Sequence, residues 1–342
     1  MHASIRFPAW AIAGLIVLVS AAQATTHEFY KGKTIRIIVS AAAGGGFDTY
    51  SRAIARHMGK HIPGNPTLIV ENMTGAGGII AANYVYVAKP DGLTIGNFAG
   101  GLVSQQLVGN PGIEFDARKF EWLGVPVKDH VACALTKASG ITSLEAWMAA
   151  KTPVKLGATG PGTNTHDTPR VLMAALGLPI HLVAGYRGTA EIRLAADSGE
   201  LAGGCWAWES IKVTWRQALE AGDVRIVLQA APTPHPELPG VPLASDVAKT
   251  DEARQFIRAG IHDPSAITRI YTLPPGTPKA RVQLLRRAFT ATLEDAEFRA
   301  EAEKSKLELD PVGGEEVEST VARLFELSPT AVAKLKEILA AK

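Results

Sequence analysis

Short apolar runs alternate with helix-length amphipathic segments along most of the chain. The first run, 35–39, reads Ile-Arg-Ile-Ile-Val. Later in the sequence, over 50–62, an apolar residue recurs every four positions. A β-branched run of this kind is typical of a buried strand, and the four-residue repeat predicts a helix with one apolar face. We expect the next two strands at 68–70 and 93–98, with a helix at 79–88 between them.

A second alternation of strands and helices begins near residue 130. The order of elements in the first unit favours a parallel sheet with right-handed crossovers. The proline-rich segment 231–242 predicts an irregular connection, and the tail from residue 279 onward is mostly helical. The strands of the second unit are expected at 131–135, 154–158, 182–184, 201–207 and 224–228.

Two α/β units and a helical tail predict an α/β fold in which two lobes face a central cleft. If the tail packs on the first unit, the chain crosses between the lobes twice, near residues 127 and 230. The first lobe then comprises residues 25–127 and 231–342, and the second comprises residues 128–230. Ligands of such folds bind outside the carboxyl ends of the strands, so the cleft is the expected binding site.

Residues 1–24 have the pattern of a signal peptide. Arg6 supplies a positive charge, and the apolar run over 9–19 is too short to span a bilayer. The sequence Ala22-Gln23-Ala24 fits the small-x-small pattern that precedes cleavage. We therefore predict a mature chain that starts at Thr25 and resides in the periplasm.

The two cysteines of the chain are Cys133 and Cys205. In an oxidising compartment they could form a disulfide. They could equally be two buried free thiols, because cysteine packs as a small apolar residue. The sequence leaves both alternatives open.

Composition and motifs exclude several classes of function. The formal net charge is +2 and no basic stripe is interleaved with aromatic residues, so we expect no nucleic-acid partner. Neither GxSxG nor HExxH occurs, and His57 and His61 have no evident third metal ligand. Thr49 stands where a dinucleotide-binding motif that starts at Gly44 needs its third glycine. We predict no catalytic residue, no metal and no cofactor.

Four glycine-rich segments lie between a predicted strand and a predicted helix. The first, 41–48, reads Ala-Ala-Ala-Gly-Gly-Gly-Phe-Asp. Glycine lets the backbone approach a ligand closely, and a helix N-terminus adds unpaired N–H groups and partial positive charge. These segments therefore predict an anion site if the two lobes face each other, although each could be a tight turn or a helix cap. The other three are 70–78, 157–166 and 185–189.

Several of these motifs together resemble one known family. The resemblance rests on 29–35, the triple glycine with Asp48, Arg52, 71–72, 75–78, 90–92, 162–166, 186–188 and 275–278. In this order they are similar to the substrate-binding receptors of tripartite tricarboxylate transporters, the Bug family. The resemblance implies a type II periplasmic-binding-protein-like fold that captures a small organic anion, a carboxylate, and delivers it to membrane transporter subunits. We expect such a receptor to be a monomer.

The resemblance also implies which residues contact the ligand. The first lobe would contribute Ala43, Gly45, Gly46, Phe47, Asp48, Gly75 and Ala76, and the second lobe Gly160, Thr163, Asn164, Thr165, Tyr186 and Thr189. Asp48 could instead cap the helix that follows it.

Two positions depart from the family pattern. Gly185 stands where many members have proline, and Trp206 stands where many have an aspartate. Trp206 could form an aromatic wall of the site and Glu209 a polar contact, or both could pack in the core. The departures leave the identity of the ligand open and do not affect the predicted fold.

The sequence thus favours a receptor that closes two lobes around a carboxylate, and it does not favour an enzyme. Two alternatives use the same cleft. One is an exported hydrolase or transferase, which would need a nucleophile or an acid–base pair in the cleft. The other is a sensor module that passes the ligand-bound state to a signalling partner.

Overall fold

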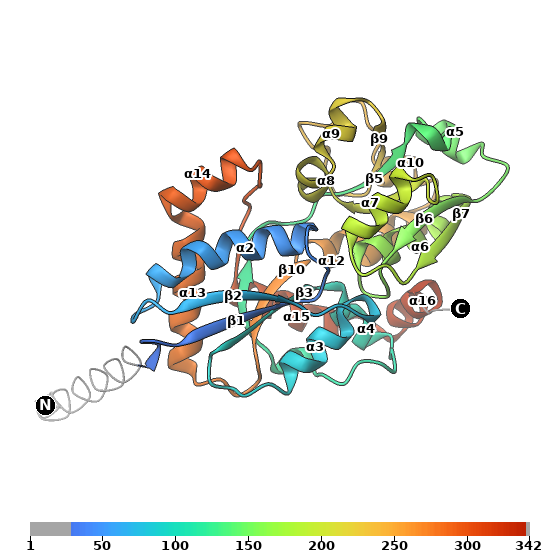
Figure 1. Cartoon of the computed structure of the whole chain (residues 1–342). Coiled ribbons are helices and arrows are strands. Elements are labelled where there is room, and N and C mark those ends of the chain that lie inside the picture. The colour runs from blue at the N-terminus through green and yellow to red at the C-terminus, as the bar shows by residue number, and fades with distance from the viewer. Residues whose placement is uncertain (1–28, 340–342) are drawn as a thin grey trace, which may run out of the picture.

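The computed structural model describes residues 29–339, which form two β-sheets with helices packed around each (Figure 1). The predicted signal peptide, residues 1–24, lies outside the described residues. Within 29–339 no helix is both long and apolar enough to cross a bilayer. The predicted α/β fold with two facing lobes is confirmed by the two separate sheets and by the structural comparisons given below.

The first sheet has six strands in the order β11-β4-β10-β3-β1-β2. β1 pairs in parallel with both β2 and β3, as the alternation of strands and helices predicts. β10 is antiparallel to β3 and β4, so the sheet is mixed. The strands are β1 (Thr34–Val39), β2 (Thr67–Asn72), β3 (Thr94–Ala99), β4 (Glu121–Val125), β10 (Arg269–Leu273) and β11 (Val312–Gly313).

The first sheet is covered by helices on both faces. Successive side chains of a strand point to opposite faces, so Ile37 joins the core cluster with α2 and α13, while Ile38 joins the cluster with α3, α4 and α15. This double burial explains why β1 is apolar on both faces. The helices are α2 (Gly46–Met58), α3 (Ile79–Tyr86), α4 (Gly101–Leu107), α13 (Lys279–Glu294), α14 (Ala296–Lys304) and α15 (Gly314–Phe325).

The second sheet has five strands in the order β7-β6-β8-β5-β9. β6 pairs in parallel with β7 and β8, whereas β5 is antiparallel to β8 and β9. The strands are β5 (Val131–Thr136), β6 (Val154–Ala158), β7 (Ile180–Ala184), β8 (Gly203–Ala207) and β9 (Val224–Gln229). The helices between them are α5 (Leu144–Met148), α6 (Asn164–Leu176), α7 (Thr189–Asp197), α8 (Trp208–Thr214) and α9 (Arg216–Glu220).

The segments after residue 230 pack differently from the expected lobe assignment. Helices α10 (Ala244–Val247), α11 (Asp251–Ile257) and α16 (Pro329–Leu339) contact α6 of the second sheet, although the expectation placed 231–342 with the first. Their apolar side chains, such as Ile257 and Leu335, share one buried cluster with the residues of α6. After the short α12 (Asp263–Ser265), the chain returns to the first sheet at β10.

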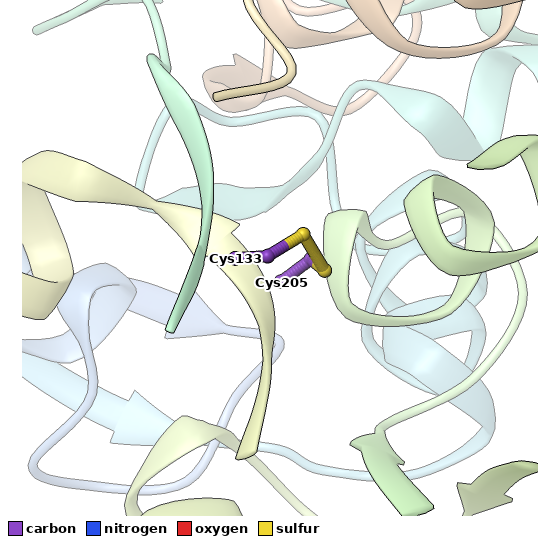
Figure 2. The surroundings of a disulfide bond; sticks show 2 residues. All are labelled: Cys133 and Cys205. Carbon is purple, nitrogen blue, oxygen red and sulfur yellow. A yellow bond between two sulfur atoms is a disulfide. The ribbon is translucent and has the colours of Figure 1, made fainter. Parts of the chain in front are cut away.

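Cys133 and Cys205 form a disulfide, which decides between the two alternatives that the sequence leaves open (Figure 2). They lie directly opposite each other on the antiparallel strands β5 and β8, with their Cα atoms 4.0 Å apart. Both residues are fully buried in the core of the second sheet. The bond therefore joins two strands of one sheet that are 72 residues apart in the sequence.

We predict that the double substitution Cys133→Ala with Cys205→Ala lowers the free energy of unfolding by about 3–4 kcal/mol, because the bond restricts a long loop of the unfolded chain. Urea unfolding of oxidised protein and variant measures the difference. Adding a reductant to the variant serves as the control and is expected to have no further effect. Equal stability of the oxidised protein and the variant would contradict the prediction.

Candidate functional site

A cavity, called here the principal cavity, lies between the two sheets, and the space free of protein atoms in and at the mouth of it is about 510 Å³, open solvent included. From the first sheet and its loops it is lined by Ala41, Gly45, Gly46, Phe47, Ala99 and Arg269. From the second sheet and its loops it is lined by Thr163, Asn164, Thr165, Thr189, Trp206 and Ser210, among others. A smaller cavity of about 310 Å³ shares Ala41, Phe47 and Thr163 with it and extends to the second glycine loop.

Three helices begin at this cavity. The first residues of α2, α6 and α7 all belong to its lining, and none of these helices has a side-chain cap at its N-terminus. By contrast, α14 begins at the surface, where Asp295 accepts hydrogen bonds from the N–H groups of Glu297 and Phe298. The first N–H groups of a helix have no partner within it, so these three N-termini offer hydrogen-bond donors and partial positive charge to the cavity.

The glycines of the first loop allow the two lobes to approach each other. A Cβ atom on Gly46 would lie 2.6 Å from Ser210 Oγ, and one on Gly45 would lie 2.9 Å from Thr189 Oγ1. Ser210 and Thr189 belong to the second sheet's helices, whereas both glycines belong to the start of α2. The triple glycine is therefore needed for close packing across the cavity as well as for its turn.

Backbone contacts hold the loops of the two sheets together near the cavity. Ala42 N donates to Arg187 O at 3.0 Å, and Arg193 Nη2 donates to Gly44 O at 3.3 Å. Further along, a Cβ atom on Gly160 would lie 2.7 Å from Gly77 N. These contacts join loops that precede α2, α3, α6 and α7, so the structure has its lobes in a closed arrangement.

Three threonine hydroxyls form a hydrogen-bonded cluster in the wall of the cavity. Thr159 Oγ1 donates to Thr163 Oγ1 at 2.8 Å and lies 3.0 Å from Thr165 Oγ1. Thr163 Oγ1 also donates to Gly160 O, and Thr165 Oγ1 accepts from Thr159 N. The cluster fixes the loop before α6, so the N–H groups at the start of that helix are held in place.

A buried ion pair lies at the cavity floor. Arg269 on β10 contacts Asp129, with 2.5 Å between Nη1 and Oδ1, and both side chains are 2% exposed. Asp129 Oδ2 also accepts from Asn164 Nδ2 at 3.0 Å, so the pair connects the first sheet to the start of α6. The Arg269 guanidinium lies over the ring of Tyr50, 4.8 Å from its centroid.

Glu209 lies beside this ion pair. Its Oε1 accepts from His130 N at 2.9 Å, and its Oε2 has no hydrogen-bond partner. Burial, reinforced by the charge of Asp129, raises the pKa of Glu209 to about 8. Burial also raises the pKa of Asp129, to about 6, against the attraction of Arg269. Burial therefore favours the protonated form of both carboxyl groups, and of the two it is Asp129 that has Arg269 in direct contact to stabilise its charged form.

Most of the residues proposed from the sequence lie at these cavities. The principal cavity contains Gly45, Gly46, Phe47, Thr163, Asn164, Thr165, Thr189 and Trp206 in its lining. Gly75 and Tyr186 line the smaller cavity.

The remaining proposed residues lie behind or beside the lining. Ala43 and Ala76 are exposed, and Gly160 packs on Gly77. Asp48 is buried and accepts hydrogen bonds from Gly44 N, Arg52 and Asn72. Asp48 therefore holds the glycine loop and does not cap α2, which has no side-chain cap.

Sequence reasoning missed the polar residues at the floor, above all Asp129, Arg269 and Ser210. Arg269 interrupts a run of otherwise uncharged residues over 267–273, which is a signal for a buried charge. Asp129 lies next to the predicted crossing between the lobes, and no local pattern distinguishes it from a surface carboxylate. Ser210 lies near the start of α8, and no local pattern in the sequence marks it as a lining residue.

Within residues 29–339, two groups of carboxylate and imidazole side chains are close enough to hold a metal, and a lysine contacts a carboxylate of each group. Lys60 Nζ lies 2.9 Å from Asp295 Oδ1 in the group with His57. Lys212 Nζ lies 2.7 Å from Glu237 Oε2 in the group with His235. An ammonium group already supplies the positive charge that the carboxylates need, so neither group carries a metal-site assignment.

The chain matches the model of a known protein family. The model of the tripartite tricarboxylate transporter family receptor matches residues 51–322, which is most of the chain. The chain belongs to this receptor family. The match begins within α2 and ends within α15, so it includes the loops of the second sheet that line the cavity but not the first glycine loop, 41–48.

Individual relatives agree with this assignment. A UPF0065 protein of Bordetella pertussis is 30% identical over 194 residues, which cover 54% of this chain and 58% of that protein. The chain thus spans little more than half the length of that relative. The structure of the periplasmic binding protein BugD has a TM-score of 0.74 and 22% identity, covering 90% of this chain and 98% of BugD. MatC from Rhodopseudomonas palustris with bound malate has a TM-score of 0.70 and 22% identity, covering 90% of this chain and 99% of MatC.

We predict that Glu209→Gln makes the stability of the receptor less dependent on pH. The folded state raises the pKa of Glu209 above its unfolded value. The stabilisation that this group gives to the folded state is therefore complete below about pH 4.5 and is lost as pH rises to about 8. Over this pH range the free energy of unfolding should fall by an amount on the order of a few kcal/mol. Urea unfolding at pH 5 and pH 8 measures it, with the exposed Glu294→Gln as control. The same decline in both variants would show that another group is responsible.

Proposed function

We propose that this chain is an exported receptor that binds a small organic carboxylate between its two lobes. The observation that carries the proposal is the meeting of three uncapped helix N-termini, those of α2, α6 and α7, at one cavity. Each N-terminus carries up to about half an elementary positive charge. Together with their N–H groups, they can replace the water that a carboxylate loses when it is buried.

The bound anion would stabilise the closed arrangement of the lobes. The donors come from both sheets, so an anion can contact all of them only when the lobes are closed. A ligand that binds one state better shifts the population toward it. We propose that the membrane subunits of a tripartite transporter recognise this closed form, and that the receptor acts as a monomer.

Export is supported by two independent features. The sequence pattern of residues 1–24 is that of a cleaved signal peptide. The buried disulfide between Cys133 and Cys205 suits an oxidising compartment such as the periplasm.

Binding is favoured over catalysis by the chemistry of the lining. Glycine, alanine and threonine hold an anion but do not transfer protons readily at neutral pH. Ser210 is the serine of the principal cavity, and its hydroxyl has no hydrogen-bond partner that could act as a base. MatC, a structural neighbour, is described with bound malate, which supports a carboxylate ligand for this cavity as well.

Calorimetry of ligand-stripped protein tests the proposal directly. The panel contains aliphatic monocarboxylates, dicarboxylates and aromatic acids, with uncharged amides of the same acids as controls. We expect at least one acid to bind and its amide not to bind. Failure of every acid to bind a folded sample would contradict the proposal.

We predict that Gly46→Ala lowers the affinity for the acid identified in that panel by at least tenfold. The added methyl group would meet Ser210 of the opposite lobe at 2.6–2.8 Å and would hold the lobes apart. Calorimetry measures the affinity, and thermal unfolding checks that each lobe stays folded. Gly313→Ala is the control, because its Cβ would have no neighbour closer than 3.9 Å. Unchanged affinity in Gly46→Ala would contradict a closed binding state.

A further inference from the structure

The cavity floor carries hydrogen-bond donors that the chain itself does not satisfy. Ser210 Oγ, Trp206 Nε1 and Arg269 Nε are buried and have no hydrogen-bond partner. All three residues line the principal cavity, and each is at most 3% exposed. Buried donors are normally paired, because leaving one unpaired costs its lost hydration. A ligand atom that accepts hydrogen bonds would remove this cost.

Two of these residues, Ser210 and Arg269, lie close to each other. A Cβ atom on Gly46 would be 2.6 Å from Ser210 Oγ and 3.2 Å from Arg269 Nη2, so both groups lie against the start of α2. Trp206 reaches the same cavity from β8 and stacks on Trp215 with ring centroids 5.6 Å apart. The serine, arginine and tryptophan therefore line the same cavity as the threonine cluster before α6, and unlike those hydroxyls their side-chain donors lack a partner.

The principal cavity has no surplus positive charge in its lining. Arg269 and Asp129 are the charged residues in the lining of the principal cavity, and they form an ion pair with each other. A second negative charge on the ligand would lie beside Asp129 without a free cation to balance it, and its desolvation would be poorly compensated. An uncharged oxygen would accept the same hydrogen bonds without this cost.

We propose that the ligand is a monocarboxylate that carries an uncharged oxygen acceptor, a carbonyl or hydroxyl group, bound by Ser210 and Trp206 beside Arg269. This inference rests on the proposed function, in which the helix N-termini hold the carboxylate. It adds a class of ligand: oxo- and hydroxy-acids are preferred over plain alkanoates and over dicarboxylates of equal length.

Matched acids test the proposal with the unaltered receptor. For each chain length from four to six carbons, calorimetry at pH 7 compares the alkanoate, its oxo derivative and the dicarboxylate. We expect the oxo-acid of the best chain length to bind about five- to tenfold more tightly than the alkanoate, as for one net hydrogen bond. We expect the dicarboxylate to bind at least tenfold more weakly than the oxo-acid.

Variants then assign the preference to the two donors. Ser210→Ala and Trp206→Phe each remove one donor and should reduce the ratio of oxo-acid affinity to alkanoate affinity about two- to threefold, because the two donors share the preference. Trp215→Phe is the control, because Trp215 stacks on Trp206 but is not among the lining residues. Retained alkanoate binding shows that the cavity of each variant is intact.

The outcomes separate this inference from the proposed function. Equal binding of oxo-acid and alkanoate, or tighter binding of the dicarboxylate, would overturn the inference and leave a carboxylate receptor. A preference that survives in both donor variants would overturn the assignment to Ser210 and Trp206. Binding of none of these acids, nor of any acid in the wider panel, would overturn both.

Discussion

An anion that is buried between two lobes must exchange its water for donors that are already in place. The donors that we propose for this receptor are backbone N–H groups at the starts of α2, α6 and α7, which line the cavity. Backbone donors impose a strict requirement on the sequence, since a side chain must not stand between the helix and the ligand. Gly45 and Gly46 meet this requirement at α2, and Gly188 precedes α7. The glycine-rich loops, the close approach of the lobes and the cavity all follow from it.

The buried ion pair of Arg269 and Asp129 supports this arrangement by connecting the two lobes at the cavity. It places a full positive and a full negative charge at the floor, where each neutralises the other. Asp129 also accepts from Asn164 at the first residue of α6, so the pair fixes a helix of one lobe relative to a strand of the other. Because the two charges cancel, we propose that helix N-termini and unpaired donors determine which anion fits.

The sequence predicts the architecture well because burial patterns are local. β1 is apolar on both faces since helices cover both, and this run is visible without the structure. β4 and β10 were not predicted, since each begins with a charged residue, Glu121 and Arg269 respectively, although both strands are buried throughout. The packing of α11 and α16 on α6 could not be predicted, since an amphipathic helix does not specify which lobe covers its apolar face.

Local sequence patterns likewise predicted only part of the candidate site. Strand-to-helix glycine loops are local signals, so Gly45, Gly46 and Thr163 could be proposed from the sequence. Asp129 and Arg269 are 140 positions apart and meet only through tertiary folding. Glu209 was proposed as a ligand contact, whereas in the structure it lies behind the lining and its pKa is raised by burial. Such pairwise contacts and pKa shifts depend on the folded environment and leave no spacing pattern in the chain.

The most direct test of the central claim is a crystal structure of the receptor with its carboxylate ligand. The claim predicts that the carboxylate oxygens lie within hydrogen-bond distance of backbone N–H groups at the N-termini of at least two of α2, α6 and α7, with the lobes closed. A carboxylate held chiefly by Arg269 or by surface side chains, or bound outside the cavity, would contradict it.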